Sequence, residues 1–306
     1  MPIALISHPD CALHDMGDHH PENSARLGAI QDQLLSSGLD FVLMHHDAPQ
    51  VSREQLCRVH DPDYVDGIFH KAPTEGRVWL DPDTSMNAFS LAAALRAAGA
   101  VVLGVDLVMS GQSSAAFCNV RPPGHHAERD RAMGFCIFNN IAVGAEHARQ
   151  AHQLKRIAIV DFDVHHGNGT EHIFHDQPDV LFCSTFQHPF YPNTGVEADS
   201  AHIVNVPLAA GSDGALFRSA VESHWLPRLH AFKPELILIS AGFDAHIDDD
   251  IAGLCLTEKD FAWVTSEIRK IADTYAGGRI VSSLEGGYDL SALGRSAAAH
   301  INALLG

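Results

Sequence analysis

Eight short apolar runs of strand length recur along the chain, and amphipathic or apolar helical patterns lie between most of them. The predicted strands cover residues 3–6, 41–44, 115–120, 157–160, 180–185, 203–206, 236–240 and 280–284. The predicted helices cover residues 24–35, 88–109, 139–152, 213–229, 257–275 and 290–305. Several strand runs are almost continuously apolar, which is typical of strands buried on both faces of a parallel sheet. The alternation therefore predicts an α/β fold with a mainly parallel central sheet flanked by helices.

Residues that could bind a metal or act in catalysis lie directly after four of these strands. The segments are RPPGHHAERDRAMGFC after residues 115–120, DFDVHHGNG after 157–160, AGFDAHIDDD after 236–240 and EGGYD after 280–284. In an open α/β sheet the carboxyl ends of the strands border the ligand-binding crevice. Four such strand ends therefore predict one assembled functional site.

The composition and net charge of the chain indicate how many domains it has and which kinds of partner it could bind. The chain has 306 residues, 46% apolar and 19% charged, without a low-complexity linker or fixed-period repeat, so we expect one domain over residues 1–306. Its 38 acidic against 20 basic residues give a net charge of −18, which argues against nucleic acid as a partner. An acidic surface favours a cationic substrate, but it is equally typical of an ordinary soluble surface.

Cysteines and apolar segments give no sign of a secreted or membrane protein. The six cysteines are scattered and form no C-x-x-C pair, which argues against a disulfide scaffold and a structural zinc site. The apolar stretch at the N-terminus is too short for a signal peptide, and no segment approaches the roughly 18 apolar residues of a membrane span. We therefore expect a cytoplasmic protein without a membrane partner.

The segment DFDVHHGNG is the best candidate for a metal centre. Asp161, Asp163 and His165 stand at i, i+2 and i+4, so an extended chain would place all three on one side. Carboxylate oxygen and imidazole nitrogen suit a divalent ion such as zinc. Asp163 and His165 would supply two ligands, and Asp244 in GFDA is the best third candidate, although it could instead cap a turn. Three protein ligands would leave a coordination position open for water, as in catalytic zinc sites.

Two further segments offer acid–base and hydrogen-bonding groups. His125 and His126 follow two prolines that stiffen the backbone, and histidine has a pKa suited to a general base near neutral pH. The chain contains four HH pairs, however, so the pair alone is weak evidence. Tyr288 follows two glycines that permit close approach to a ligand, and its hydroxyl could donate to an oxyanion. A turn tyrosine that packs its ring is an equally good local interpretation.

Taken in order, RPPGHH, MGFC, DFDVHHGNGT, SAGFDAH and EGGYD resemble the motifs of zinc-dependent histone deacetylases. The likeness is greatest to the class II-like branch and its bacterial relatives, which share the arginase–deacetylase α/β fold. HPENSARL at residues 20–27 is similar to the N-terminal loop of that family, so the resemblance covers nearly the whole chain. It implies a zinc ion held by Asp163, His165 and Asp244.

The resemblance also implies catalytic roles. His126 would be the general base that deprotonates the zinc-bound water and then protonates the leaving amine, and His125 would be its electrostatic partner, paired with Asp161. Tyr288 would donate a hydrogen bond to the substrate carbonyl, and weakly active class IIa relatives carry histidine at this position. Asn168 would orient His126. Class I members carry aspartate there, and a neutral partner should leave His126 less basic.

The resemblance further implies a substrate tunnel and a second cation. The tunnel for an acylated amine would be formed by Gly134, Phe135 and Tyr191, with Asp83 at its rim. The inner monovalent cation, usually potassium, would be held by Asp161, Asp163, His165 and Ser184.

The leading functional hypothesis is hydrolysis of acetyl or acyl groups from acetyl-lysine side chains of a peptide or protein, or from similar amines. An acetylpolyamine amidohydrolase is the alternative within the same chemistry. Polyamine-selective eukaryotic relatives use a glutamate where this chain has Ile251, although Asp248–Asp250 lie beside that position. A non-catalytic acyl-lysine binding module is the alternative of another class, and a reader needs no proton shuttle. A two-metal ureohydrolase would need a longer series of acids and histidines.

Overall fold

The structure is a computed structural model that describes residues 2–196 and 200–306. Its main sheet has eight strands in the order β2-β1-β5-β10-β9-β6-β7-β8, and every neighbouring pair is parallel. The strands are β1 (Ile3–Ser7), β2 (Leu43–Asp47), β5 (Ala115–Cys118), β6 (Ile157–Asp161), β7 (Val180–Gln187), β8 (Ile203–Leu208), β9 (Leu236–Ala241) and β10 (Ile280–Leu284). The predicted parallel α/β fold is therefore confirmed.

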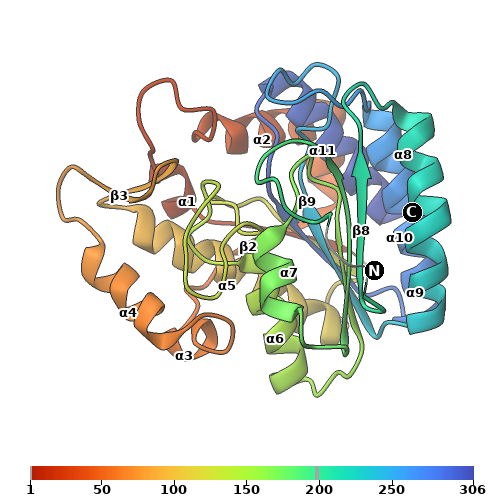
Figure 1. Cartoon of the computed structure of the whole chain (residues 1–306), viewed down its shortest axis with the longest axis horizontal. Coiled ribbons are helices and arrows are strands. Elements are labelled where there is room, and N and C mark those ends of the chain that lie inside the picture. Colours follow the sequence, from red (N-terminus) through yellow and green to blue (C-terminus); the bar gives the residue numbers. More distant parts are fainter. Residues whose placement is uncertain (1, 197–199) are drawn as a thin grey trace.

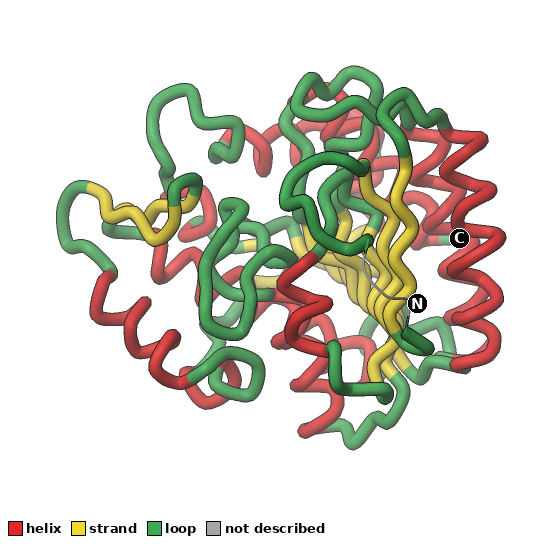
Figure 2. Tube along the Cα trace, viewed as in Figure 1, coloured by secondary structure: helices red, strands yellow, loops and turns green. Residues whose placement is uncertain are grey.

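Helices cover both faces of this sheet, and the strands lie between them in Figures 1 and 2. One layer contains α5 (Ser90–Met109) and α6 (Asn140–Ala151), and the other contains α2 (Ala25–Ser37), α10 (Glu258–Tyr275) and α11 (Leu290–Leu305). Strand β1 shows why strands between two helical layers are apolar at consecutive positions. Ile3 and Leu5 pack into the cluster shared with α2, α10 and α11, whereas Ala4 and Ile6 pack into the cluster shared with α5 and α6. Successive side chains alternate between two apolar layers, so the strand must be apolar throughout.

The remaining elements are short and lie around the edges of these layers. They are α1 (Asp10–Leu13), α3 (Arg53–Leu56), α4 (Pro62–Lys71), α7 (Asn168–Phe174), α8 (Gly214–Ala220), α9 (Leu226–Phe232), a 3₁₀ turn at Leu39–Val42, a π-helical turn at Val221–Trp225 and the antiparallel hairpin β3 (Arg77–Asp81) and β4 (Thr84–Asn87). The periodicity did not reveal α4 or the hairpin, because short, partly exposed elements carry little apolar signal.

Two predicted elements differ from those observed. The strand expected at residues 41–44 begins later, as Leu43–Asp47, because residues 39–42 form the 3₁₀ turn. The helix expected at 213–229 is divided into α8 and α9 by the π-helical turn. Pro227 lies in the first turn of α9, and a proline has no N–H with which to continue the preceding helical hydrogen bonds.

Helix α5 corrects the expectation that no segment is long and apolar enough to cross a membrane. It has 20 residues and a mean hydropathy of 1.9 over its 18-residue window, which meets the criterion of length and composition. However, 72% of that window is buried inside the structure, where α5 packs against β1, β5 and β10. The same composition is typical of a core helix that covers a parallel sheet.

The order of the strands determines where the functional segments meet. β5, β10, β9 and β6 are neighbours in the sheet, although they come from widely separated parts of the chain. Because they are parallel, their carboxyl ends lie at the same edge. The four polar segments that follow them are thereby brought side by side.

Candidate active site

The structure brings Asp163, His165 and Asp244 together at the carboxyl ends of β6 and β9. One ligand atom from each residue lies within 4.8 Å of the others, and all three residues are buried. His165 Nδ1 lies 2.9 Å from Asp163 Oδ1 and 3.2 Å from Asp244 Oδ2. The backbone is not extended here, contrary to expectation, because β6 ends at Asp161. The N–H groups of Asp163 and His165 donate to the carboxylates of Asp161 and Asp163, respectively, at 3.1 and 2.9 Å, and these bonds turn the chain.

The donor set and its surroundings fit a divalent metal ion. Asp244 Oδ2 is buried and, apart from the His165 imidazole at 3.2 Å, has no hydrogen-bond partner among the residues that the structure describes. Burial and the Asp163 carboxylate raise the pKa of Asp244 to about 6. Burial alone would lower the pKa of His165, but Asp163 and Asp244 outweigh it and raise that pKa to about 9. The site thus attracts positive charge, and a cation and the His165 proton compete for the same atoms.

Glycine at position 286 is required by the carboxylates. A Cβ atom on Gly286 would lie 2.0 Å from Asp244 Oδ2 and 2.7 Å from Asp163 Oδ2, closer than any side chain allows. Its N–H group donates to Asp163 Oδ2 at 2.8 Å. The first residues of EGGYD therefore lie directly against two of the three candidate ligands and help to orient them.

His125 lies in a strongly negative pocket. Its Nδ1 donates to Asp161 Oδ2 at 2.9 Å, and its Nε2 lies 3.8 Å from Asp163 Oδ1. Burial alone would lower the pKa of His125, but the carboxylates of Asp161 and Asp163 raise it well above the usual value. The imidazole is therefore suited to remain positively charged beside its neighbour His126.

His126 has the opposite environment. Burial lowers its pKa well below the usual value, and the charges of His125 and His165 lower it further. Its Nδ1 donates to Asn168 Oδ1 at 2.7 Å, because the Asn168 amide group donates to Glu128 Oε1 at 2.7 Å and so directs its oxygen towards the ring. This arrangement leaves His126 Nε2 without a proton, which is the form that a general base requires.

Tyr288 lines the same cavity as His126 and His165 and is held from two sides. The backbone N–H of Tyr288 donates to Asp249 Oδ2 at 2.6 Å, and Arg26 Cζ lies 4.9 Å from the centre of the phenol ring. Burial raises the pKa of Tyr288 well above its usual value; Arg26 opposes this shift, while Asp244 and Asp163 add to it. The hydroxyl therefore keeps its proton and can donate it in a hydrogen bond.

A cavity of about 220 Å³ opens onto these groups. It is lined by Asp83, His126, Gly134, Phe135, His165, Phe190, Tyr191, Ile251 and Tyr288. All four residues expected in the tunnel thus line it. Gly134 has φ of +58°, and a Cβ there would lie 2.3 Å from His126 Cδ2, so only glycine fits. Asp83 Oδ1 accepts the Gly134 N–H at 3.0 Å, so this carboxylate also holds the tunnel wall.

Asp161 and Ser184, two of the residues expected to hold an inner monovalent cation, lie side by side in the sheet. Asp161 and Ser184 are direct partners in the register of β6 and β7. Ser184 Oγ is buried and has no hydrogen-bond partner within the described part of the chain. A buried hydroxyl oxygen without a partner beside a buried carboxylate fits a bound cation.

Comparison with known proteins identifies the family. The model of the histone deacetylase domain matches residues 20–304. The chain belongs to the histone deacetylase family. It is accordingly a deacetylase or amidohydrolase of that family, and a metal ion is implied by the family.

Three relatives and one solved structure of this family illustrate the likeness. Histone deacetylase 14, chloroplastic, of Arabidopsis thaliana is 37% identical over 99% of this chain and 77% of its own length. The histone deacetylase-like amidohydrolase of Pseudomonas aeruginosa is 37% identical over 88% of this chain and 71% of its own. Polyamine deacetylase HDAC10 of Mus musculus is 36% identical over 100% of this chain and 48% of its own. The crystal structure of the HDA15 HD domain has a TM-score of 0.94 at 34% identity, covering 99% of this chain and 88% of that one.

Sequence reasoning missed several residues that support this histone deacetylase site. Glu285 is fully buried and accepts the N–H groups of Gly124 and His125 at 2.6 and 3.1 Å. Burial raises the pKa of Glu285 to about 7. Phe190 stacks on His165 with ring centres 5.4 Å apart. Glu285 is the first residue of EGGYD, and Phe190 directly precedes Tyr191. These positions were the available sequence signals, but neither has a distinctive spacing.

Proposed function

We propose that this chain is a zinc-dependent deacetylase that removes acetyl or other acyl groups from the side-chain amine of lysine. The observation that carries the proposal is the convergence of His126, His165 and Tyr288 on one cavity, beside the buried carboxylates of Asp163 and Asp244. The cavity joins a neutral histidine, a protonated phenol and a metal-ligating cluster, which together meet the needs of amide hydrolysis.

Asp163, His165 and Asp244 would hold the zinc ion, leaving room for water and the substrate carbonyl. When bound, zinc lowers the pKa of a coordinated water to about 7 and polarises a carbonyl oxygen. The buried position of Asp244 Oδ2, and its lack of a hydrogen-bond partner other than His165 within the described residues, support this assignment.

His126 would move the protons of the reaction. The residue lines the cavity, and its Nε2 is left as an acceptor because Nδ1 donates to Asn168 Oδ1. It can take a proton from the attacking water and afterwards deliver it to the leaving amine nitrogen. The charged His125, paired with Asp161, lowers the pKa of the neighbouring ring and so favours delivery of that proton.

Tyr288 would stabilise the oxygen of the substrate. Its hydroxyl, which retains its proton, can donate to the carbonyl and then to the tetrahedral oxyanion. The Asp249 carboxylate fixes the start of this turn through the N–H groups of Tyr288 and Asp289. The substrate oxygen would thus meet a hydroxyl whose backbone is held in place.

The composition of the cavity supports a lysine side chain over a polyamine. Ile251 gives its wall an apolar side chain where a cationic chain would favour a carboxylate. Two of the neighbouring acids are engaged within the protein: Asp248 pairs with Arg295 at 2.8 Å, and Asp249 holds the Tyr288 turn. The polyamine deacetylase among the relatives nevertheless makes an acetylated polyamine the second candidate substrate.

The test is a comparison of kcat/KM on an acetyl-lysine peptide, an N-acetylated polyamine and a longer acyl-lysine peptide. We expect the acetyl-lysine peptide to be preferred and acetate release to stop after chelation and return with Zn²⁺. A higher kcat/KM on the polyamine would favour the second candidate. Binding of the peptide without acetate release by the zinc-loaded protein would contradict the hydrolase and favour a reader.

We also propose that Asp161, Asp163, His165 and Ser184 hold a monovalent cation, with potassium as the best candidate. The Ser184 hydroxyl, which has no hydrogen-bond partner among the described residues, and the buried Asp161 carboxylate support it. Such an ion would offset negative charge behind the metal ligands. Replacing potassium with a bulky organic cation should lower the melting temperature of the wild type more than that of Ser184→Ala. Equal shifts would contradict the site.

A further inference from the structure

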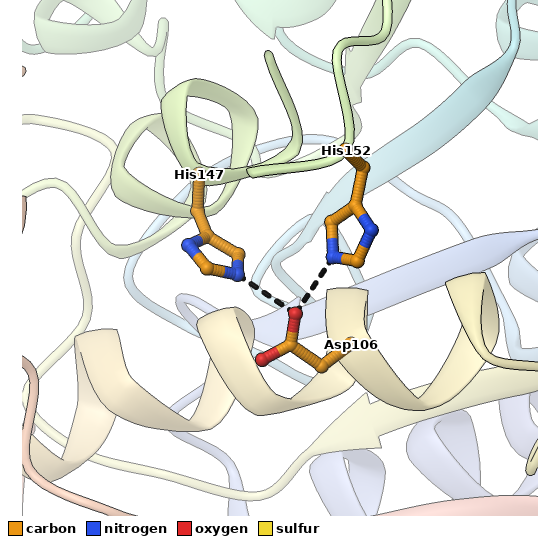
Figure 3. Close-up of side chains that lie close together, drawn as sticks. All are labelled: Asp106, His147 and His152. Carbon is orange, nitrogen blue, oxygen red and sulfur yellow. Dashed lines mark hydrogen bonds and ion pairs between the residues drawn. The ribbon is translucent and has the colours of Figure 1, made fainter. Parts of the chain in front are cut away.

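A second cluster of metal-ligating side chains lies on the layer formed by α5 and α6. Asp106 on α5, His147 on α6 and His152 just after α6 each offer one ligand atom, and these atoms lie within 4.8 Å of one another. In Figure 3 both imidazole rings point at the same carboxylate. The Nε2 atoms of His147 and His152 lie 2.8 and 2.7 Å from Asp106 Oδ1.

The sequence of α5 makes Asp106 conspicuous. The one other charged residue of this helix is Arg96, which is engaged with Asp10 and the Ala48 carbonyl. Asp106 contacts two histidines instead of a cationic side chain. Burial would raise the pKa of Asp106, but its hydrogen bonds with His147 and His152 lower it, so the carboxylate stays ionised. An ionised carboxylate between two imidazoles is a donor set suited to zinc and similar ions.

The cluster is held on rigid elements. α5 and α6 pack along each other, and a Cβ atom on Gly144 would lie 2.4 Å from Val101 Cγ1, so a small residue permits their close approach. His147 Nδ1 is buried, and Nε2 is the ring nitrogen that faces Asp106 Oδ1, at 2.8 Å. The Asp106 side chain is 48% exposed, so solvent can complete the coordination of an ion. These conditions are those of a pre-formed site of three protein ligands with open positions.

We propose that Asp106, His147 and His152 form a second divalent metal site, of the zinc class, that ties α5 to the end of α6. Its donor types are those of the candidate active site, carboxylate oxygen and imidazole nitrogen, but here two imidazoles surround one carboxylate oxygen, whereas there one imidazole lies between two carboxylates. It shares no residue with the active site, and its role is structural. The ion would link the C-terminal parts of two helices that cover one face of the sheet.

A third cluster, Glu128, Asp130 and His172, meets the same distance criterion and provides a useful contrast. It has one imidazole instead of two, and Asp130 and His172 are exposed. Glu128 is already engaged by Asn168 and Arg131. We therefore assign the second ion to Asp106, His147 and His152, and His172→Gln serves as the matched control.

The experiment counts zinc ions. Chelator-treated protein is dialysed against buffered Zn²⁺, and the bound metal is measured by atomic emission. We expect two ions in the wild type and in His172→Gln, and loss of one ion in Asp106→Asn and in His152→Gln with kcat unchanged. Asp244→Asn should lose the other ion. Equal zinc content in wild type, Asp106→Asn and His152→Gln would overturn the proposal, and the contacts would then be ion pairs only.

A second measurement separates this site from the catalytic one. In the Asp244→Asn background, added zinc should raise the melting temperature, because an ion that binds only the folded protein stabilises it. The shift should disappear in the Asp106→Asn, Asp244→Asn double variant. Persistence of the shift in the double variant would overturn the proposal. Zinc loss from Asp106→Asn alone, with an unchanged count in Asp244→Asn, would instead contradict the catalytic assignment.

Discussion

Glu128 determines which way the amide of Asn168 faces. The Asn168 Nδ2 group donates to Glu128 Oε1 at 2.7 Å, so its Oδ1 is turned to His126 Nδ1, also at 2.7 Å. A carboxylate can only accept hydrogen bonds when ionised, and therefore the amide cannot flip without losing both contacts. Through this chain of contacts a residue outside the cavity fixes the tautomer of the candidate base.

Removal of the Glu128 carboxylate should impair turnover without impairing binding. In Glu128→Ala the Asn168 amide loses its acceptor, and a lost hydrogen bond of about 1 kcal/mol corresponds to a decrease in kcat of roughly fivefold to tenfold. KM should stay unchanged. Glu128→Gln retains an acceptor oxygen that can take the place of the carboxylate oxygen. The kcat of this variant should therefore stay within about twofold of the wild-type value. Steady-state kinetics of both variants checks this, and equal kcat for all three proteins would show that Glu128 does not orient Asn168.

Replacement of Asn168 by aspartate should move the pH dependence of kcat/KM. The general base must be neutral, and a carboxylate beside Nδ1 stabilises the charged imidazole and raises the pKa of His126. The acidic limb of the profile should therefore shift to higher pH in Asn168→Asp. The matched comparison is Asn168→Ala, which removes the hydrogen-bond partner of His126 without adding charge. In this variant the acidic limb should not move to higher pH. An unchanged limb in Asn168→Asp would mean that the two side chains are not coupled.

Loss of the Tyr288 hydroxyl should remove oxyanion stabilisation and leave the metal in place. Removal of one such donor typically lowers kcat by about 10²–10³-fold, and we expect a loss of this size in Tyr288→Phe. The phenyl ring can still pack against Arg26, so stability should change little. Zinc content and kcat are measured on the same sample. Near-normal kcat with zinc bound would exclude Tyr288 from the mechanism.

A carboxylate at position 251 should change the preference between substrates. Ile251 lines the cavity, and a negative charge there attracts a substrate that carries an additional ammonium group. Ile251→Glu should therefore raise kcat/KM for an N-acetylated polyamine relative to the acetyl-lysine peptide, by about tenfold for a gain of ~1.4 kcal/mol. Ile251→Gln is the uncharged control of the same size. A similar ratio in both variants would show that charge at this position does not select the substrate.

The buried ion pairs of Glu22 should contribute to stability in a pH-dependent way. Glu22 is fully buried and pairs with Arg121 and with Arg26, the latter at 3.1 Å. Glu22→Gln would leave two buried guanidinium groups without their counter-charge, at a cost of about 3–5 kcal/mol in the free energy of unfolding. Urea unfolding at pH 7 measures it. A loss below 1 kcal/mol would contradict the role of these pairs.

The sign of the pH effect follows from the lowered pKa of Glu22. Burial alone would raise that pKa, but the charge of Arg121 outweighs burial and lowers it to about 2. The ionised group therefore stabilises the fold above the unfolded-state pKa of about 4.3, and this contribution is lost as the pH falls towards 2. The difference between wild type and Glu22→Gln should shrink across that interval. A constant difference would exclude ionisation of Glu22 as its origin.

The apolar pattern was sufficient to predict the parallel α/β fold, because strands buried on both faces must be apolar at consecutive positions. It placed β6, β9 and β10 to within one residue at each end, since those strands are buried at the centre of the sheet. It failed at β2, an edge strand with exposed side chains, where burial does not dictate the sequence. It also missed Pro227 as the residue that interrupts the helix between α8 and α9.

The sequence by itself determined which residue types follow each central strand, and these local motifs predicted the candidate metal ligands and both histidines. Only the tertiary structure decided their partners. The strand order β5-β10-β9-β6 sets Glu285 against the His125 backbone, and the packing of separate loops sets Glu128 against Asn168 and Phe190 against His165. Contacts of this kind join residues that are distant in the chain, and no local spacing encodes them. The cluster of Asp106 with His147 and His152 likewise exists only because α5 and α6 pack together.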